Sequence, residues 1–230
     1  IGLALACALA EAGAHVTLCA RSGDELDAAV AALRGRGDTA EALPLDVTDQ
    51  VAVEAALSAR APFDILVNNA GMNRPAPFVD VDMADFDRIM GLNVRAAFAL
   101  SQRVARGMIE AGRPGAIIYI SSQMGHVGGI DRTVYAASKH AIEGLTKAMA
   151  IDLGPKGIRV NSIGPTFIRT DLTASTFANP ERLAWIRSKI KLDRIGEVED
   201  IMGAVVFLAS DAAALITGTS LLIDGGWTAG

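Results

Sequence analysis

A tyrosine and a lysine stand four positions apart in the run Tyr135-Ala-Ala-Ser-Lys139. Residues at positions i and i+4 share one face of a helix, so we expect the phenol and the ammonium to be neighbours. A free tyrosine has a pKa of about 10, and a nearby cation lowers that pKa by favouring the phenolate. Together with the Ser122 hydroxyl, delivered from a separate strand end, the pair could move a proton onto or off an oxygen atom. The alternative is an amphipathic helix with an interfacial tyrosine and a solvated lysine.

Composition narrows the class of protein. The chain has 230 residues, of which 51% are hydrophobic and 20% are charged, which is typical of a globular protein with a large core. A formal charge of −5 and a pI near 5.2 argue against a nucleic-acid or anionic-membrane partner. No apolar run reaches the roughly 18 residues of a membrane span. Cys7 and Cys19 lack metal-ligand spacing, so we expect no metal site and interpret them as reduced, buried packing residues of a cytoplasmic protein.

Short apolar runs alternate with amphipathic stretches from one end of the chain to the other. The expected strands are 15–20, 42–45, 63–67, 115–120, 158–163 and 220–223. The expected helices are 3–12, 25–33, 50–57, 83–109, 133–153, 179–189 and 198–209. Strands that are apolar on both faces belong in a parallel sheet covered by helices. The alternation predicts a Rossmann-type, doubly wound α/β sheet, and the lack of a linker or repeat predicts a single domain over residues 1–230.

Polar clusters follow five of the expected strands. They are Ala20-Arg21, Asp46-Val47, Asn68-Asn69-Ala70-Gly71, Ser121-Ser122 and Gly164-Pro165-Thr166. In open α/β sheets, ligands bind beyond the carboxyl ends of the strands. Because packing alone does not explain five polar strand ends in one sheet, we predict that they form one ligand site.

At these residues the sequence closely resembles the short-chain dehydrogenase/reductase family, and the resemblance covers essentially the whole chain. The matching motifs, in order, are Asn68-Asn69-Ala70-Gly71, Asn93, Ser122, Tyr135, Lys139, Asn161-Ser162-Ile163-Gly164-Pro165 and Asp224-Gly225-Gly226. The resemblance implies four catalytic residues, which are Asn93, Ser122, Tyr135 and Lys139. It also implies that family members are homotetramers built through the helices that carry Asn93 and Tyr135 and through the last strand.

The resemblance assigns a role to each catalytic residue. Tyr135 would exchange a proton with the substrate oxygen, and Ser122 would hydrogen-bond that oxygen. Lys139 would lower the pKa of Tyr135 and bind the nicotinamide ribose, so that both residues also contact the cofactor. Asn93 would hold a water molecule that links Lys139 to solvent. The alternative for Asn93, a poor helix former in mid-helix, is a buried amide satisfied by the protein itself.

The start of the chain departs from the family pattern. The family begins with a strand and a glycine-rich loop that cradles the cofactor pyrophosphate, and only the tail of that loop, Ile1-Gly2, is present. The missing strand would lie in the middle of the sheet, and its absence would leave two neighbouring strands without ladder hydrogen bonds. We therefore predict that roughly 15–20 residues, one strand and a turn, precede Ile1 in the natural protein.

The end of the second family strand points to the cofactor. In NAD-binding sheets an acidic residue there accepts hydrogen bonds from the ribose, but this chain has Ala20 followed by Arg21. The planar donors of arginine suit a 2′-phosphate, so we predict NADP(H). NAD(H) remains possible if Arg21 caps a turn, faces solvent or pairs with Asp24 or Glu25.

The resemblance names the remaining cofactor contacts. Asp46 would meet the adenine amino group beside Val47, with an Asx-turn as its alternative role. The adenosine ribose would lie on Asn69, Ala70 and Gly71, and the nicotinamide on the segment after Pro165. Including the loop tail, the further predicted contacts are Ile1, Gly2, Ile168 and Thr170. Thr166 stands where the family more often has glycine.

The substrate would be bound by the loop 123–132 and by a lid over 170–191. Phe167, Phe177 and Trp185 could line an apolar pocket, with core or interface packing as the alternative. Arg74 and Arg132 are expected to be solvated surface residues, and recognition of an acidic substrate group is their alternative role. His126 is expected to be a loop histidine without a catalytic role. The predicted function is an NADP(H)-dependent oxidoreductase acting on a ketone, a sugar or polyol, or a 3-oxoacyl thioester. Alternatives are an NAD(H)-dependent alcohol or polyol dehydrogenase and a nucleotide-sensing protein without catalysis; the complete catalytic set argues against the latter.

Overall fold

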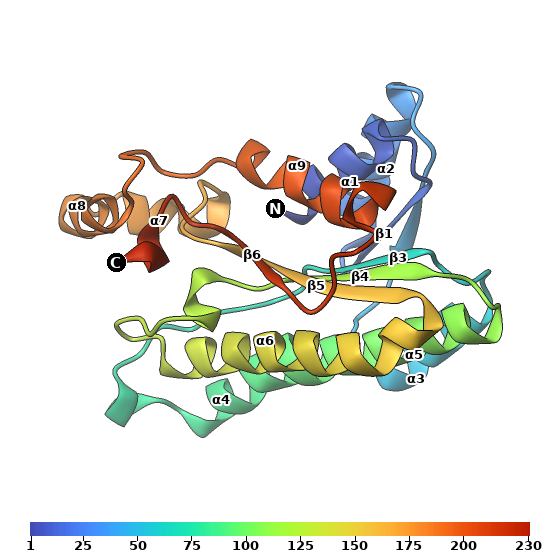
Figure 1. Cartoon of the computed structure of the whole chain (residues 1–230). Helices are drawn as coiled ribbons and strands as arrows, with labels where there is room; N and C mark the ends of the chain where they lie inside the picture. Colours follow the sequence, from blue (N-terminus) through green and yellow to red (C-terminus); the bar gives the residue numbers. More distant parts are fainter.

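The computed structural model describes residues 1–230, apart from the side chains of Asp171, Leu172 and Ser175. A layer of parallel strands, hydrogen-bonded as one two-stranded and one four-stranded sheet, lies between two layers of helices (Figure 1). Its strands are β1 (Val16–Ala20), β2 (Ala40–Pro44), β3 (Ile65–Asn68), β4 (Gly115–Ile120), β5 (Ile158–Pro165) and β6 (Ser220–Ile223). All strand pairs are parallel, which confirms the predicted α/β class.

Helices cover both faces of this layer of strands. The helices of the described chain are α1 (Gly2–Glu11), α2 (Gly23–Gly35), α3 (Gln50–Ser58), α4 (Met83–Met90), α5 (Ala97–Glu110), α6 (Thr133–Leu153), α7 (Asp171–Phe177), α8 (Pro180–Lys189) and α9 (Glu199–Ala209). Of these, α7 and α8 lie beyond the ends of the strands (Figure 1). Helices α1 and α9 pack on one face, and α5 and α6 pack on the other (Figure 1). No helix among the described residues is long and apolar enough to cross a bilayer.

The strands form two separate hydrogen-bonded groups, β1-β2 and β3-β4-β5-β6. Helix α1 contacts both groups: Leu5 and Ala8 pack with the larger sheet, and Cys7 and Ala10 pack with β1 and β2. The side of β3 that does not pair with β4 has no ladder partner within the described chain. The prediction of a strand before Ile1 concerns residues outside this sequence and stays a prediction.

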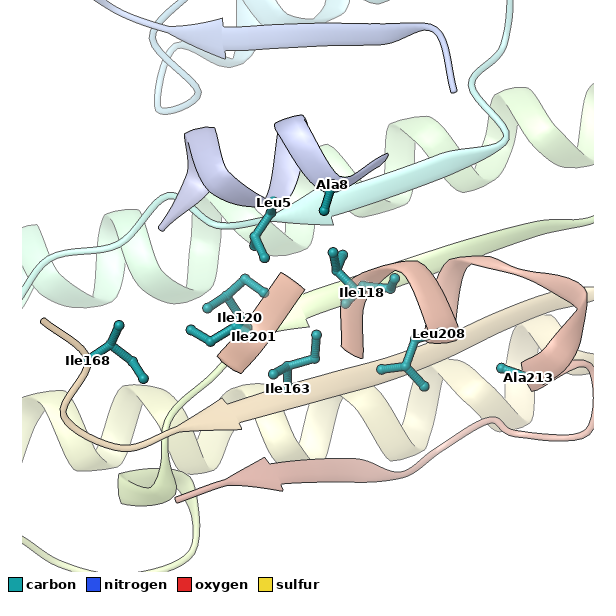
Figure 2. Packing of buried hydrophobic residues seen from close by; sticks show 10 residues of the cluster. Leu5, Ala8, Ile118, Ile120, Ile163, Ile168, Ile201, Leu208 and Ala213 are labelled. Atoms are coloured by element: carbon teal, nitrogen blue, oxygen red, sulfur yellow. The ribbon is translucent and has the colours of Figure 1, made fainter. Parts of the chain in front are cut away.

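The main core lies between α1, α9 and the larger sheet (Figure 2). Ile118 and Ile163 project from β4 and β5 and are fully buried against Ile201 and Leu208 of α9. Their alternation with residues that face α5 and α6 explains why β4 is apolar along its whole length. The core therefore fixes the carboxyl ends of β4 and β5, from which the next segments start.

Three sequence expectations need correction. The expected helix 83–109 is interrupted by a π-helical turn over Gly91–Ala96, since glycine and asparagine are poor helix formers and the Asn93 side chain is bonded elsewhere. Helix α7, within the expected lid, was not predicted. The two cysteines are not buried: Cys7 is half-buried and Cys19 is exposed, because β1 pairs with β2 alone.

We expect Ile201→Ala to lower the free energy of unfolding by about 2–5 kcal/mol, since it removes a fully buried side chain from the main core. The control is Val51→Ala, which changes a helical valine that is 82% exposed and leaves stability nearly unchanged. Urea unfolding followed by circular dichroism measures both. Equal losses in the two variants would contradict the assignment of the core.

Candidate active site

Tyr135 and Lys139 lie one turn apart on α6, beside the end of β4. The Lys139 ammonium is buried, donates a hydrogen bond to the Ile120 carbonyl at 2.8 Å, and lies 5.5 Å from the centre of the Tyr135 ring. Ser122 follows β4, and its hydroxyl accepts a hydrogen bond from the Met124 N–H at 3.1 Å and donates one to the Gln123 side chain at 2.7 Å. The structure thus brings a serine, a tyrosine and a lysine to one strand end.

Burial controls the protonation of this group. It raises the pKa of Tyr135 above the usual value, and the Ser122 hydroxyl and the Arg132 charge only partly oppose it. Burial also lowers the pKa of Lys139 to about 8, against the opposing effect of Glu143. The net direction for Tyr135 is upward because desolvation of the phenol outweighs the nearby groups that oppose it, and the lowering effect of Lys139 stays a prediction.

The π-helical turn places the Asn93 amide against the segment after β3. Its Oδ1 accepts a hydrogen bond from the Met72 N–H at 2.8 Å, and its Nδ2 donates to the Met72 carbonyl at 2.9 Å and to the Ser138 hydroxyl at 3.0 Å. Both amide hydrogens are thus used within the protein, as in the alternative interpretation of Asn93. A water molecule could use only the second lone pair of Oδ1, and the relay role stays a prediction.

The start of α1 and the end of β3 approach each other closely. A Cβ atom on Gly2 would lie 2.5 Å from Nδ2 of Asn69, so a larger residue there would require the Asn69 side chain to move. A Cβ atom on Gly71 would lie 3.8 Å from the Lys139 ammonium. Asn69, Ala70 and Gly71 are exposed, as a ligand-binding segment requires. Ile1 precedes α1 as its N-cap residue.

Arg21 and Asp46 follow β1 and β2 at the same edge of the sheet. Asp46 accepts hydrogen bonds from the Thr48 N–H at 2.9 Å and hydroxyl at 2.7 Å, which is the Asx-turn alternative. These bonds lower the pKa of Asp46, and the Arg21 charge lowers it further, so the two residues are close. Arg21 is exposed and, among the described side chains, pairs with neither Asp24 nor Glu25. Val47 is half-buried beside this turn.

The segment after β5 supplies the other end of the predicted cofactor site. Pro165 ends β5, and the buried Thr166 hydroxyl has no hydrogen-bond partner within the described protein. Ile168 is 97% buried in the core, so its backbone rather than its side chain is available to a ligand. Thr170 caps α7 together with Thr173. The Thr166 hydroxyl lacks a partner within the described protein, the Arg21 guanidinium is exposed, and the backbone at Gly2 lies close to Asn69. These features fit the phosphates and the amide group of a bound dinucleotide.

A cavity of about 240 Å³ lies between the loop after β4 and helices α7 and α8. We call it the substrate cavity; its lining residues are Met124, Ile130, Asp131, Arg132, Phe167, Thr176, Glu181, Arg182, Trp185 and Ile186. Of the three aromatic residues that were predicted to line a pocket, Phe167 and Trp185 line the substrate cavity. Phe177 packs behind Phe167, with ring centres 6.4 Å apart.

The two arginines that were expected on the surface differ. Arg74 is an exposed residue that pairs with Asp85 at 3.4 Å, as expected. Arg132 instead lines the substrate cavity and is half-buried, which corrects the expectation for this residue. The reason is tertiary, since α8 lies across from the loop that carries Arg132.

Sequence reasoning missed Glu143, which lies one turn beyond Lys139 on α6. Its carboxylate is buried; Oε2 accepts a hydrogen bond from the Ser162 hydroxyl at 2.8 Å, and Oε1 lies 3.6 Å from Nε2 of His126. Its negative charge raises the pKa of Lys139. The i+4 spacing from Lys139 was the available signal.

Fold and site together define a Rossmann-type protein with the acid–base group of an oxidoreductase. The family model described as enoyl-(acyl carrier protein) reductase matches residues 1–228. Among curated proteins, the D-erythrulose reductase of Gallus gallus is 41% identical, over 99% of this chain and 91% of that protein. The gluconate 5-dehydrogenase of Gluconobacter oxydans is 39% identical, over 99% of this chain and 90% of its own.

Solved structures agree with these sequence matches. A gluconate 5-dehydrogenase of Burkholderia cenocepacia, in complex with NADP and tartrate, superposes with a TM-score of 0.95 at 34% identity, covering 99% of this chain and 91% of that one. A putative 2-deoxy-D-gluconate 3-dehydrogenase of Agrobacterium tumefaciens with bound NADP gives 0.94 at 39% identity, covering 99% and 92%. The chain belongs to the short-chain dehydrogenase/reductase family.

We expect Glu143→Gln to move the alkaline limb of the kcat/KM pH profile to lower pH, by about one unit. The amide retains the size of the side chain but loses the charge that raises the pKa of Lys139, so the ammonium deprotonates below pH 8. Glu110→Gln, which removes an exposed charge at the end of α5, is the control. A Glu143→Gln profile that coincides with the wild-type profile would contradict this coupling.

Proposed function

We propose that the protein is an NADP(H)-dependent oxidoreductase that interconverts a ketone and a secondary alcohol on a small sugar or polyol. The observation that carries this proposal is the packing of Ser122, Tyr135 and Lys139 at one strand end, beside a cavity sized for a small molecule. Relatives named D-erythrulose reductase and L-xylulose reductase support a hydroxylated ketone as substrate.

In the reducing direction, Tyr135 donates its proton to the carbonyl oxygen, and the Ser122 hydroxyl hydrogen-bonds the same oxygen. The raised pKa of Tyr135 keeps the phenol protonated at neutral pH, which suits an acid. Bound NADP(H) supplies the hydride. Lys139, held by the Ile120 carbonyl, presents its ammonium toward Gly71 and the predicted ribose position.

Arg21, Asp46, Val47, Asn69, Ala70 and Gly71 would hold the adenosine half of the cofactor. Ile1 and Gly2 at the start of α1 would lie at the pyrophosphate, and Pro165, Ile168 and Thr170 at the nicotinamide. The exposed guanidinium of Arg21 supports NADP(H) over NAD(H), since it is available to a 2′-phosphate. The NADP complexes of two similar structures agree with that preference.

A homotetramer and a cytoplasmic location belong to the same proposal. Three large apolar side chains on α5 and α6 are exposed, at 47% for Phe98, 41% for Ile109 and 76% for Ile151. Such a surface on the helices expected to form the interface supports association of identical chains. Cys7 and Cys19 are both free thiols, as in a reducing compartment.

We expect Tyr135→Phe to lower kcat by a factor of 10³ or more, on the order of what loss of a general acid costs, while NADPH binding persists. The chain has only two tyrosines, which makes Tyr119→Phe a matched control; its buried hydroxyl hydrogen-bonds Ser101, away from the site. Turnover of L-xylulose and quenching of NADPH fluorescence measure the two properties. Tyr135→Phe turnover equal to that of Tyr119→Phe would contradict the mechanism.

We expect Arg21→Asp to reverse the cofactor preference, because a carboxylate repels a 2′-phosphate and accepts hydrogen bonds from a ribose diol. The ratio of kcat/KM for NADPH to that for NADH should fall by about two orders of magnitude. This is the expected cost of losing a charge-assisted hydrogen bond to the 2′-phosphate and of placing a carboxylate near it. Arg21→Lys, which keeps the charge, should retain most of the preference. An unchanged ratio in Arg21→Asp would exclude Arg21 as the phosphate ligand.

A further inference from the structure

The substrate cavity contains two guanidinium groups that come from different elements. Arg132 directly precedes α6, and Arg182 lies in the first turn of α8. Burial and the positive charge of Arg182 lower the pKa of Arg132, whereas the Asp131 carboxylate and the Tyr135 phenol act in the opposite direction. The fold therefore holds two like charges near each other at the wall of a cavity.

Nothing in the local structure explains a cation at position 132. Arg132 is the N-cap residue of α6, where short polar residues are preferred and the helix macrodipole disfavours positive charge. Its side chain makes no capping hydrogen bond and reaches only the Asp131 carbonyl, at 3.3 Å. Among the described side chains, which exclude Asp171, no carboxylate lies within ion-pair distance of Arg132 or Arg182.

The two acidic residues of the cavity have roles of their own. Asp131 adopts a left-handed backbone conformation with φ of 56°, which aspartate tolerates better than most residues, and its carbonyl accepts a hydrogen bond from Ala76. Glu181 lies in the first turn of α8, where a negative charge is favourable. Asp131 opposes the effect of Arg182 on Arg132 only in part, and neither cavity carboxylate is within ion-pair distance of Arg132, so its guanidinium donors stay open to a carboxylate from solution.

The cavity also faces the acid–base group. Met124, which lines it, donates its N–H to the Ser122 hydroxyl. The charge of Arg132 lowers the pKa of Tyr135, which places the guanidinium near the phenol. Phe167 and Trp185 provide an apolar wall suited to the C–H groups of a carbon chain. A ligand bound by Arg132 therefore lies within reach of Tyr135.

We propose that the substrate is an anionic hydroxy-ketone, a keto-sugar acid, whose carboxylate binds between Arg132 and Arg182 while its carbonyl faces Ser122 and Tyr135. Two planar guanidinium groups suit a carboxylate because each can donate two parallel hydrogen bonds. This inference rests on the proposed function and narrows its substrate class from small sugars to sugar acids.

The kinetic test compares two six-carbon ketones that differ in charge, 5-keto-D-gluconate and D-fructose, with saturating NADPH. We expect the wild-type protein to favour the acid in kcat/KM by a factor of about 10–100, as for charge-assisted hydrogen bonds. Arg182→Gln should abolish most of that preference, and Arg132→Gln should do the same. Arg187→Gln, an exposed arginine on the same helix outside the cavity, should retain it.

Equal kcat/KM values for the two ketones in the wild-type protein would overturn the inference and leave the proposed function intact. So would an Arg182→Gln variant that loses both activities by the same factor, because the arginine would then act on folding or positioning rather than on charge.

If the protein reduced neither ketone, the result would count against the proposed function. A binding measurement still tests the inference in that case. Tartrate and threitol share a four-carbon hydroxylated skeleton, but only tartrate carries carboxylates. With saturating NADP, we expect tartrate and not threitol to raise the melting temperature of the wild-type and Arg187→Gln proteins, and this shift to be lost in Arg182→Gln. No tartrate shift, or one that persists in Arg182→Gln, would overturn the inference.

Discussion

The site depends on the burial of one ammonium group. Lys139 is only 6% exposed, and a buried charge is costly unless hydrogen bonds or opposite charges compensate it. Three groups do so here: the Ile120 carbonyl at the end of β4, the ring face of Tyr135, and the Glu143 carboxylate one turn further along α6. The compensation requires α6 to lie in one register against β4, and that register also sets the position of Tyr135 relative to Ser122.

A second set of contacts extends this register to the predicted cofactor segment. Asn93 bonds both backbone groups of Met72 and the Ser138 hydroxyl, which in turn donates to the Tyr135 carbonyl at 2.7 Å. Four residues from three distant parts of the chain thus form one hydrogen-bonded unit, in which the Asn93 and Ser138 side chains are buried. Because the π-helical turn aims the Asn93 amide at Met72, a regular helix in its place would break the connection between the segment after β3 and the catalytic helix.

Local sequence patterns predicted most of the framework. The expected helix 133–153 coincides with α6, and the expected strands 115–120 and 158–163 correspond to β4 and to most of β5. For β4, burial on both faces leaves a clear apolar composition signal. The π-helical turn and α7 were missed, since they depend on contacts with distant segments. The pKa of Tyr135 shows the same limit: spacing indicates which charge is near, but only the fold shows that burial raises the pKa of the phenol.

The placement of cations connects the framework to selectivity. The chain carries a net charge of −5, so its overall field does not attract anions. Yet Arg21 stands exposed at the end of β1, and Arg132 and Arg182 face the substrate cavity near Tyr135. On a protein with a negative net charge, these local cations select particular anions. Ligands whose shape lets them reach a specific guanidinium group bind, whereas other anions are not attracted. A neutral sugar would leave the repulsion between the two cavity arginines unchanged, whereas a carboxylate bound to both would reduce it while the substrate is positioned for reaction.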